Sequence, residues 1–398
     1  MTEVKNKEER ANLVAAVRSA FEAEQIPWFR ALVEQPSCTR EPQDVEAAAR
    51  LVDQAMVDLG FPLARHADSE GRFADHRVYR RHAPEPAVAL VGHVDTVFPR
   101  SLGFFGFRRE GDQVFGPGVL DMKSGLSVVV FGLRALRAAA RDAFDGLRVC
   151  FVCVSDEEVG SPSSRDLYAQ LAPTLRRALV FEGGRTEDRV VTGRKGGAFF
   201  RLKAEGRAAH AGNHHRDGVN AIAALAPLVA EVEALTDYDC GVTCNVGVIR
   251  GGTAKNTVPD AAEMEIDVRF VDPSDGERIE HALRALAASE PPVVGASLRL
   301  EGEITRPPMR PTAEAQLLRH HYEACAAEVG LRVGEAPLQG GGSDANLLSS
   351  LGVPSIDGLG PYGRHFHRTD EWSSLESLRA RTEALALFLW DEAHRAVS

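Results

Sequence analysis

Side chains that can bind metal ions or transfer protons recur at turns of this sequence rather than within its apolar faces. They are two histidines and five carboxylates, namely His93, Asp95, Asp121, Glu157, Glu158, Glu182 and His367. Imidazole and carboxylate groups are common ligands of divalent transition metals. Even without Asp95 the set could hold two divalent ions, and such a pair can activate water for hydrolysis. The pattern therefore favours a metallohydrolase.

His93 and Asp95 stand two residues apart. On an extended backbone both side chains point to the same side. The Asp95 carboxylate could then accept the second imidazole N–H and fix the tautomer that binds metal. By itself, one His-x-Asp is a weak signal. Asp121 lies in a glycine-punctuated turn at residues 118–125, where it could be a ligand or simply an acid that starts a helix.

The adjacent acids Glu157 and Glu158 follow the apolar run at residues 147–154. Neighbouring carboxylates repel each other unless a cation or a proton relieves them, although an exposed acidic turn would also explain the pair. Glu182 follows the apolar residues 178–181 and precedes two glycines. An acid at the tip of a core strand has no evident structural role, so Glu182 is a candidate ligand.

His367 lies in a loop that follows the glycine- and proline-containing turn at residues 360–363. A histidine in a loop is often only solvated. His365 is close enough in the sequence to be a rival ligand. Both histidines therefore remain candidates at this point.

The elements that must position these residues alternate between helices and strands up to residue 192. Helical spacing covers residues 10–33, 44–60 and 124–141, and short apolar strands cover 87–91, 147–155 and 178–181. Short apolar strands separated by helices predict a mainly parallel sheet that is covered on both faces. Ligand groups gather beyond the carboxyl ends of such strands. His93, the Glu157–Glu158 pair and Glu182 each come just after one of these ends.

Residues 193–306 follow a different pattern. Strands are expected at 197–206, 242–249, 262–270 and 297–300, and helices at 217–235 and 274–288, with Asp217 as the helix cap. This β-α-β-β-α-β order is that of the ferredoxin-like split unit. Helices expected at 314–329, 345–351 and 375–396 return to the first pattern. The sequence thus predicts a domain of residues 1–192 and 307–398, with residues 193–306 inserted.

Composition excludes several classes of function. The net charge is -11, and no basic cluster is dense enough to follow a phosphate backbone, so we expect no nucleic-acid partner. No stretch approaches the roughly 18 apolar residues of a membrane span, so we expect no membrane partner. The first residues do not resemble a secretion signal, and the six cysteines are expected to be reduced thiols. These features predict a cytoplasmic protein.

Several motifs occur together and in order between about residues 87 and 371. They are Gly92-His93-Val94-Asp95-Thr96-Val97, Gly118-x-x-Asp121-Met122-Lys123-Ser124-Gly125, Ser155-Asp156-Glu157-Glu158-x-Gly160 and His367-x-x-Asp370-Glu371. In this the chain resembles the di-zinc metallopeptidase family of glutamate carboxypeptidase, acetylornithine deacetylase and succinyl-diaminopimelate desuccinylase, and glutamate carboxypeptidase most of all. The resemblance implies an α/β, zinc-peptidase-like catalytic domain with a mainly parallel central sheet and an inserted ferredoxin-like (α+β) lid and dimerisation domain.

The resemblance also implies roles for the candidate residues. Asp121 would bridge two metal ions, with His93 and Glu182 completing one site and Glu158 and His367 the other. Glu157 would be the general base that takes a proton from the water between the ions, and Asp95 would orient His93. The expected ions are zinc, although the same ligands accept cobalt or manganese.

A second set of residues is implied for the inserted domain and its neighbourhood. His210 would help to hold the oxyanion, acting from the partner subunit of a homodimer that forms through the lid. Asn256 and Arg269 would grip the carboxylate of the substrate, and Gly341 and Gly342 would belong to a substrate-pocket loop. Without the resemblance, the sequence favours a solvated salt-bridge face for Arg269. The glycine run 340–342 lacks the Lys-Ser/Thr pair of a nucleotide-binding loop.

Two positions depart from the family pattern. No proline follows Gly212 closely, and Gly183 rather than proline follows Glu182. Glutamate at position 182 is typical of the carboxypeptidases and deacylases, which act on N-acyl amino acids or short peptides with a free carboxylate. The expected activity is metal-dependent hydrolysis of an amide bond next to such a carboxylate, as in glutamate carboxypeptidase. An N-acyl-amino-acid deacylase like acetylornithine deacetylase is the alternative, and a catalytically silent metal-binding scaffold is a third.

Overall fold

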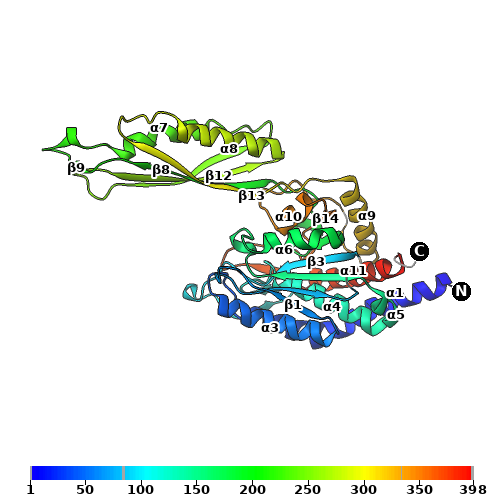
Figure 1. Cartoon of the computed structure of the whole chain (residues 1–398). Helices are drawn as coiled ribbons and strands as arrows, with labels where there is room; N and C mark the ends of the chain where they lie inside the picture. The colour runs from blue at the N-terminus through cyan, green and yellow to red at the C-terminus, as the bar shows by residue number, and fades with distance from the viewer. Residues whose placement is uncertain (1, 83–85, 333, 396–398) are drawn as a thin grey trace. The chain divides into compact units, whose positions relative to one another are not determined.

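The computed structural model describes residues 2–82, 86–332 and 334–395, and the chain divides into two compact units (Figure 1). Unit 1 comprises Met1–Gly193, Pro311–Leu338 and Ser343–Ser398, and unit 2 comprises Arg194–Arg310 and Gln339–Gly342. The sequence analysis places residues 339–342 in the catalytic domain, whereas here they group with unit 2. The reason is main-chain pairing, because the Lys195 N–H donates to the Gln339 carbonyl at 2.8 Å.

The core of unit 1 is a six-stranded sheet in the order β1-β2-β6-β3-β7-β14. Its strands are β1 (Leu63–His66), β2 (His76–Arg80), β3 (Ala87–His93), β6 (Val149–Val154), β7 (Leu175–Val180) and β14 (Ser355–Ile356). Strands β6, β3, β7 and β14 run parallel, and β1 and β2 are antiparallel additions. Every residue of β3 and β6 is buried, which explains their continuously apolar sequences. The predicted mainly parallel central sheet is confirmed.

Helices pack around this sheet (Figure 1). They are α1 (Thr2–Ala20), α2 (Ile26–Glu34), α3 (Pro42–Asp58), α4 (Lys123–Ala139), α5 (Arg141–Gly146), α6 (Ser164–Leu171), α9 (Ala313–Glu328), α10 (Asp344–Ser350) and α11 (Leu375–Arg395). The single helix expected over residues 10–33 is wrong, because a π-helical segment at Phe21–Gln25 separates α1 from α2. Pro27 near the start of α2 lacks the N–H that would continue a regular α-helix. Residue 396, the expected end of the last helix, lies outside the described residues.

A second small sheet of unit 1 was missed by the sequence analysis. Its order is β15-β16-β5-β4, with β15 at Gly363–Arg364, β16 at Trp372–Ser374, β5 at Gln113–Phe115 and β4 at Arg108–Glu110. Each strand has only two or three residues, and β4 is fully exposed. Strands this short and polar carry no periodic apolar signal.

Unit 2 is built on an antiparallel sheet in the order β10-β12-β8-β13. Its strands are β8 (Gly196–Glu205), β10 (Thr243–Gly251), β12 (Ala261–Phe270) and β13 (Ser297–Arg306), and its helices are α7 (Ala221–Glu233) and α8 (Pro273–Ala288). Burial alternates along β12, as expected for a sheet with one face covered by helices. The predicted ferredoxin-like unit is confirmed. Its first helix is capped by Asn220, which accepts from the Ala223 N–H at 2.9 Å, and not by Asp217.

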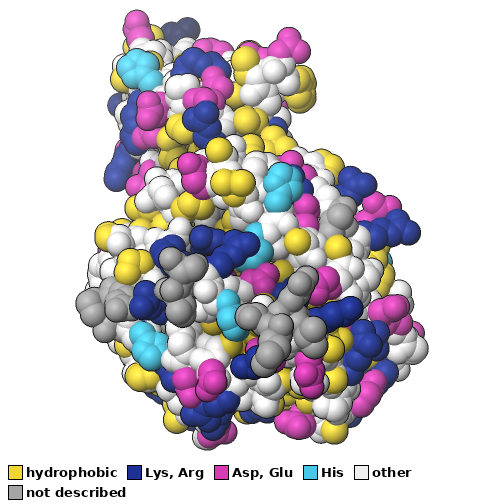
Figure 2. Space-filling view, turned by 90° about the vertical axis from the view of Figure 1, so that its right-hand side faces the viewer, with side chains coloured by type: hydrophobic (Ala, Val, Ile, Leu, Met, Phe, Trp, Pro, Cys, Tyr) yellow, Lys and Arg dark blue, Asp and Glu magenta, His cyan; other side chains and the backbone are white. Residues whose placement is uncertain are grey.

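The surface agrees with the composition. Figure 2 shows Lys and Arg side chains interspersed with Asp and Glu on the face that it draws. Among the described residues, no helix combines the length and the apolar character that crossing a membrane requires. All six cysteines are free thiols, and only Cys240 is exposed.

Parallel pairing brings four candidate residues, from three strand ends, to one edge of the central sheet. His93, the last residue of β3, pairs with Val154 of β6, and Val91 pairs with Val180 of β7. The Glu157–Glu158 turn and Glu182 therefore begin level with His93. Parallel strands end at the same edge, so this edge collects their side chains.

Gly125 holds the start of α4 against this edge. A Cβ atom at position 125 would lie 2.0 Å from the Phe181 carbonyl oxygen, far inside van der Waals contact. Phe181 immediately precedes Glu182. Only glycine allows the helix that follows Asp121 to approach the strand that leads to Glu182.

We predict that Gly125→Ala lowers the free energy of unfolding by about 2–3 kcal/mol, because the backbone must move to admit the methyl group. The measurement is guanidinium unfolding of the full chain followed by circular dichroism. Gly146→Ala, in α5, is the matched control, because a Cβ there meets nothing within 4 Å. It should be neutral or stabilise by up to about 1 kcal/mol. Equal effects of the two substitutions would contradict the packing argument.

Candidate metal centre

Two groups of possible ligands share one carboxylate at the edge of the central sheet. His93, Asp121 and Glu182 form one group, and Asp121, Glu158 and His367 form the other. In each group the ligand atoms lie within 4.8 Å of one another. The structure thus brings together all five residues that the sequence analysis selects as ligands, with Asp121 between the other four.

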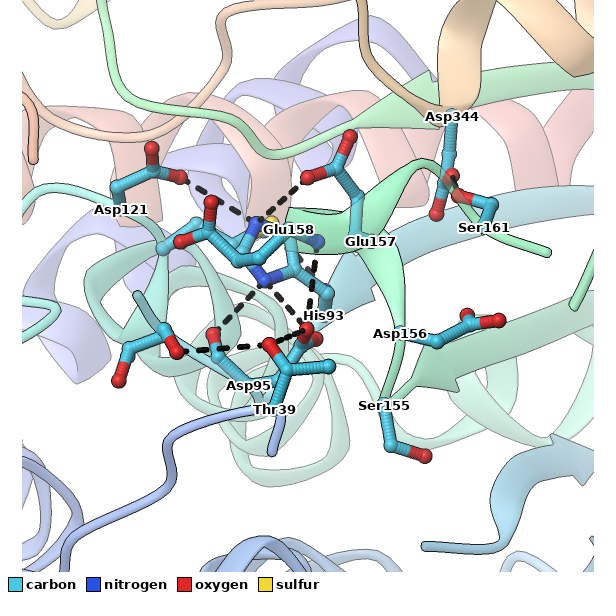
Figure 3. A network of polar contacts seen from close by, with 12 residues as sticks. Thr39, His93, Asp95, Asp121, Ser155, Asp156, Glu157, Glu158, Ser161 and Asp344 are labelled. Carbon is cyan, nitrogen blue, oxygen red and sulfur yellow. Dashed lines mark hydrogen bonds and ion pairs between the residues drawn. The ribbon is translucent and has the colours of Figure 1, made fainter. Parts of the chain in front are cut away.

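The first group centres on the buried imidazole of His93, drawn in Figure 3. Its Nε2 lies 3.3 Å from Asp121 Oδ1 and 3.6 Å from Glu182 Oε1. Its Nδ1 lies 3.0 Å from the Asp95 carbonyl oxygen, so an N–H there would leave the Nε2 lone pair facing the acids. The Asp95 carboxylate is farther away, at 3.4 Å. The backbone of Asp95, more than its side chain, orients His93.

The Asp95 carboxylate forms hydrogen bonds with two other segments of the chain. Its Oδ2 accepts hydrogen bonds from Thr39 Oγ1 at 2.7 Å and from the Glu158 N–H at 3.3 Å. It therefore ties the turn that carries Glu158 to the end of β3 (Figure 3). Nothing in the sequence around Thr39 indicates this contact.

The second group is completed by His367. Its Nε2 lies 3.2 Å from both Asp121 Oδ2 and Glu158 Oε2. Both His367 and its rival His365 have a positive φ, of 61° and 70°, so the backbone does not distinguish between them. His365, the rival ligand, contacts Asp370 instead, with Nδ1 3.0 Å from Oδ2. His367 is therefore the better candidate ligand.

The residues fit metal ions on two counts. His93 Nε2 and Glu158 Oε1 are buried and lack a hydrogen-bond partner. Buried polar atoms almost always have a partner, so an unpartnered pair at one place indicates something further that binds there. The donors are imidazole nitrogens and carboxylate oxygens, which suit zinc, cobalt or manganese.

Burial and mutual repulsion perturb the acids of the centre. Burial, with the charge of Asp121 added, raises the pKa of Glu158 and of Glu182 to about 7. Burial opposes ionisation of Asp121 too, but the hydrogen bond with His367 and the nearby charge of His93 lower its pKa below the usual range. Hydrogen bonds with Asp121 and Glu158 raise the pKa of His367 to about 11. The metal-free centre thus keeps protons that a bound cation would displace.

Glu157 lies beside both groups and belongs to neither. It opens a short 3₁₀ turn, Glu157–Val159, after β6, and its Oε2 is 3.9 Å from His93 Nε2. Figure 3 shows the carboxylate directed toward the centre of the cluster. Glu157 therefore faces the cluster without being one of the five possible ligands.

Glu371 holds the main chain at Asp121, the residue that both groups share. Its buried Oε1 accepts from the Leu120 N–H at 2.7 Å and from the Asp121 N–H at 3.2 Å. Burial, with the charge of Asp121 added, raises its pKa to about 8. The sequence analysis uses Glu371 only as part of a motif and assigns it no role. Glu371 stands four residues after His367 in the sequence, and this closeness to a candidate ligand was the available signal of a role.

His210 and the four candidate substrate-binding residues fall into two places in unit 2. His210 pairs with Thr257, and the Asn256 carbonyl accepts from the Ala211 N–H at 2.9 Å. Arg269 pairs with Gly197 at the opposite end of β12 from Ala261. Nearby in sequence, Arg194 donates to the Gly341 carbonyl at 2.9 Å, and Gly342 follows.

The length of β12 keeps these places apart. The strand has 10 residues, so its ends are about 30 Å apart at a rise of roughly 3.4 Å per residue. Within one chain, Asn256 and Arg269 therefore do not form one carboxylate site. Arg269 pairs with Asp267 at 2.6 and 2.8 Å, which is the salt bridge that the sequence left open.

Comparisons with known proteins agree with this architecture. Residues 192–294 match the peptidase dimerisation domain. The chain is 27% identical to carboxypeptidase G2 of Pseudomonas sp. (strain RS-16), over 92% of this chain and 88% of the relative. It is 28% identical to succinyl-diaminopimelate desuccinylase of Novosphingobium aromaticivorans, over 82% of this chain and 88% of the relative.

A solved structure shares the fold. The M20 family metallo-carboxypeptidase of Sulfolobus solfataricus superimposes with a TM-score of 0.75 at 16% identity, over 93% of this chain and 99% of that one. Together with the domain match and the two relatives, the shared fold supports an enzyme that hydrolyses peptide or amide bonds with the help of metal. In its domain match, its sequence and its fold, the chain is therefore similar to the M20 peptidases.

Proposed function

We propose that this enzyme hydrolyses an amide bond next to a free carboxylate, in the manner of a glutamate carboxypeptidase. The observation that carries the proposal is the pair of ligand groups joined by Asp121, with Glu157 beside them. Similarity to carboxypeptidase G2 over most of both chains supports the choice of substrate. The substrate would be an N-acyl amino acid or a short peptide.

The five ligands would divide between two ions. His93, Asp121 and Glu182 would hold one, and Asp121, Glu158 and His367 the other. Two bound divalent ions, most simply zinc, would polarise the scissile carbonyl and make water more acidic. The residues of the chain supply the proton transfers and the positioning.

Glu157 would be the general base. Because its carboxylate is not part of either ligand group, its oxygens are not needed to hold an ion. It would take a proton from the attacking water and then pass it to the leaving amine. Thr39 hydrogen-bonds Asp95, and Asp95 hydrogen-bonds the Glu158 N–H. These two contacts would keep Glu158 in place during proton transfer by Glu157.

We further propose a homodimer that forms through unit 2. The match to a peptidase dimerisation domain supports this assembly. It would also explain why His210 and Asn256 lie far from Arg269 along β12. In a dimer, His210 and Asn256 would serve the oxyanion and carboxylate of the substrate in the partner's site, whereas Arg269, Gly341 and Gly342 would serve their own.

A second candidate is an N-acyl-amino-acid deacylase. Similarity to a succinyl-diaminopimelate desuccinylase over most of both chains favours it. The same ligands and the same Glu157 would act, and only the pocket for the acyl group would differ. Substrate preference therefore separates the two candidates.

The deciding experiment is a panel of zinc- or cobalt-loaded reactions that measures amino-acid release from peptidyl, acetyl and succinyl amino acids. Preference for C-terminal glutamate with bulky acyl groups is the expected result. Replacing the free carboxylate by an amide should lower kcat/KM by on the order of 10–100-fold, because charged hydrogen bonds are lost. Preference for small acyl groups would establish the deacylase instead. Release from no member would refute both.

We predict that Glu157→Gln retains both metal ions but lowers kcat by on the order of 10²–10⁴-fold, because it removes the proton acceptor and no ligand. Steady-state kinetics and metal analysis of the same preparation test this. Glu110→Gln, at an exposed acid of β4, is the matched control and should behave as the wild type. Normal turnover by the Glu157 variant would exclude Glu157 as the base, and lost metal would make it a ligand.

Metal affinity should depend more steeply on pH below about 7. Above this pH, binding displaces protons only from the two histidines, whereas below it Glu158 and Glu182 must also lose theirs. Each additional displaced proton lowers the affinity about tenfold per pH unit. The measurement is calorimetric titration in buffers of different ionisation enthalpy. Glu158→Gln should release one proton fewer below pH 7, and an unchanged proton count would contradict the assignment.

A further inference from the structure

A second group of metal-ligating side chains lies where α9 packs on α11, and no step of the proposed hydrolysis uses it. It consists of His321, Cys325 and Asp391, whose ligand atoms lie within 4.8 Å of one another. His321 and Cys325 are four residues apart on α9, so they share one face of the helix. Asp391 meets them from the last turns of α11. All three belong to unit 1.

The distances suit a small tetrahedral cation. Asp391 Oδ2 lies 3.1 Å from His321 Nε2 and 3.4 Å from Cys325 Sγ. Around zinc, with bonds of about 2.0 Å to nitrogen and oxygen and about 2.3 Å to sulfur, neighbouring ligands are roughly 3.3–3.6 Å apart. The two distances to Asp391 Oδ2 are thus within a few tenths of an ångström of those around zinc, and His321 Nε2 and Cys325 Sγ lie within 4.8 Å of each other.

The surroundings are arranged as around a metal-binding histidine. His321 Nδ1 lies 3.5 Å from the buried carboxylate of Glu392. A carboxylate there can accept the Nδ1–H and leave the Nε2 lone pair for an ion. Arg395 also approaches Nδ1, at 3.3 Å, from the exposed end of α11, so its guanidinium must shift when Nδ1 carries a proton.

The Arg10 side chain already lies beside this cluster as a cation, but it leaves Asp391 Oδ2 accessible to a metal ion. Its guanidinium binds Asp391 through Oδ1, and it also binds Glu328 at 2.5 Å. Oδ2 is the atom that faces His321 and Cys325. The two positive charges of an added dication would be balanced by the negative charges of the Asp391 carboxylate and a Cys325 thiolate.

We propose that His321, Cys325 and Asp391 form a cation site for Zn²⁺ or Co²⁺, separate from the candidate metal centre and with water as the fourth ligand. Binding would release the thiol proton of Cys325 to solvent, while the His321 proton on Nε2 moves to Nδ1 beside Glu392. Water can enter, because 23% of the Asp391 side chain is exposed.

Cobalt distinguishes this site from the other. The candidate metal centre offers only nitrogen and oxygen ligands among the described residues, so a sulfur-to-cobalt charge-transfer band in the near ultraviolet can arise only from a cysteine. We expect the chelated full-length protein, titrated with Co²⁺, to show this band and to saturate it at one ion per chain. The cobalt titration measures absorbance and not hydrolysis, so its outcome does not depend on the proposed function.

Cys325→Ala and His321→Ala should each remove the band and one bound ion, with hydrolysis of the preferred substrate unchanged. Cys244→Ala, at a buried thiol of unit 2, is the matched control and should keep the band. If circular dichroism shows that either variant is unfolded, Asp391→Asn, which retains both helix α9 ligands, should still weaken cobalt binding at least tenfold. No band in the wild type, or a band that survives Cys325→Ala, overturns the proposal.

Discussion

The concentration of negative charge around Asp121 is the constraint on which the rest of unit 1 depends. Three buried carboxylates, Asp121, Glu158 and Glu182, meet two imidazoles at one edge of the sheet. Burying like charges together is costly unless cations or protons compensate them. Without metal, the chain compensates by retaining protons, which explains the raised pKa of Glu158 and Glu182. The fold therefore brings together acids whose charges it can balance, without a cation, only by retaining protons.

The scaffold holds this unfavourable cluster in place through contacts that carry no metal. Glu371 binds the main chain at Leu120 and Asp121, and Asp95 links Thr39 to the Glu158 turn. Gly125 lets α4 approach Phe181 closely enough to fix the turn before it. Each contact works on backbone rather than on a ligand atom. Preorganisation of the ligands thus depends on hydrogen bonds and packing one layer away from the chemistry.

The α9–α11 cluster uses the same physical principle with softer ligands. There, too, one carboxylate meets two neighbours, although both contact the same oxygen, Asp391 Oδ2, and a second carboxylate lies behind the imidazole. It differs because Arg10 already neutralises part of its charge. The cluster is therefore stable without metal, and a cation would replace protons rather than relieve strain.

The sequence by itself determined the two fold classes, the mainly parallel sheet and the identity of the candidate ligands, because apolar periodicity and ordered motifs are local properties of the chain. It also placed His93, Glu158 and Glu182 after strand ends. It could not reveal the sheet of β4, β5, β15 and β16, whose strands are too short to show a period. Nor could it show that Glu371 and Thr39 act on the centre, or that β12 separates Asn256 from Arg269. Those relations join residues distant in the chain, and only tertiary packing and strand register decide them.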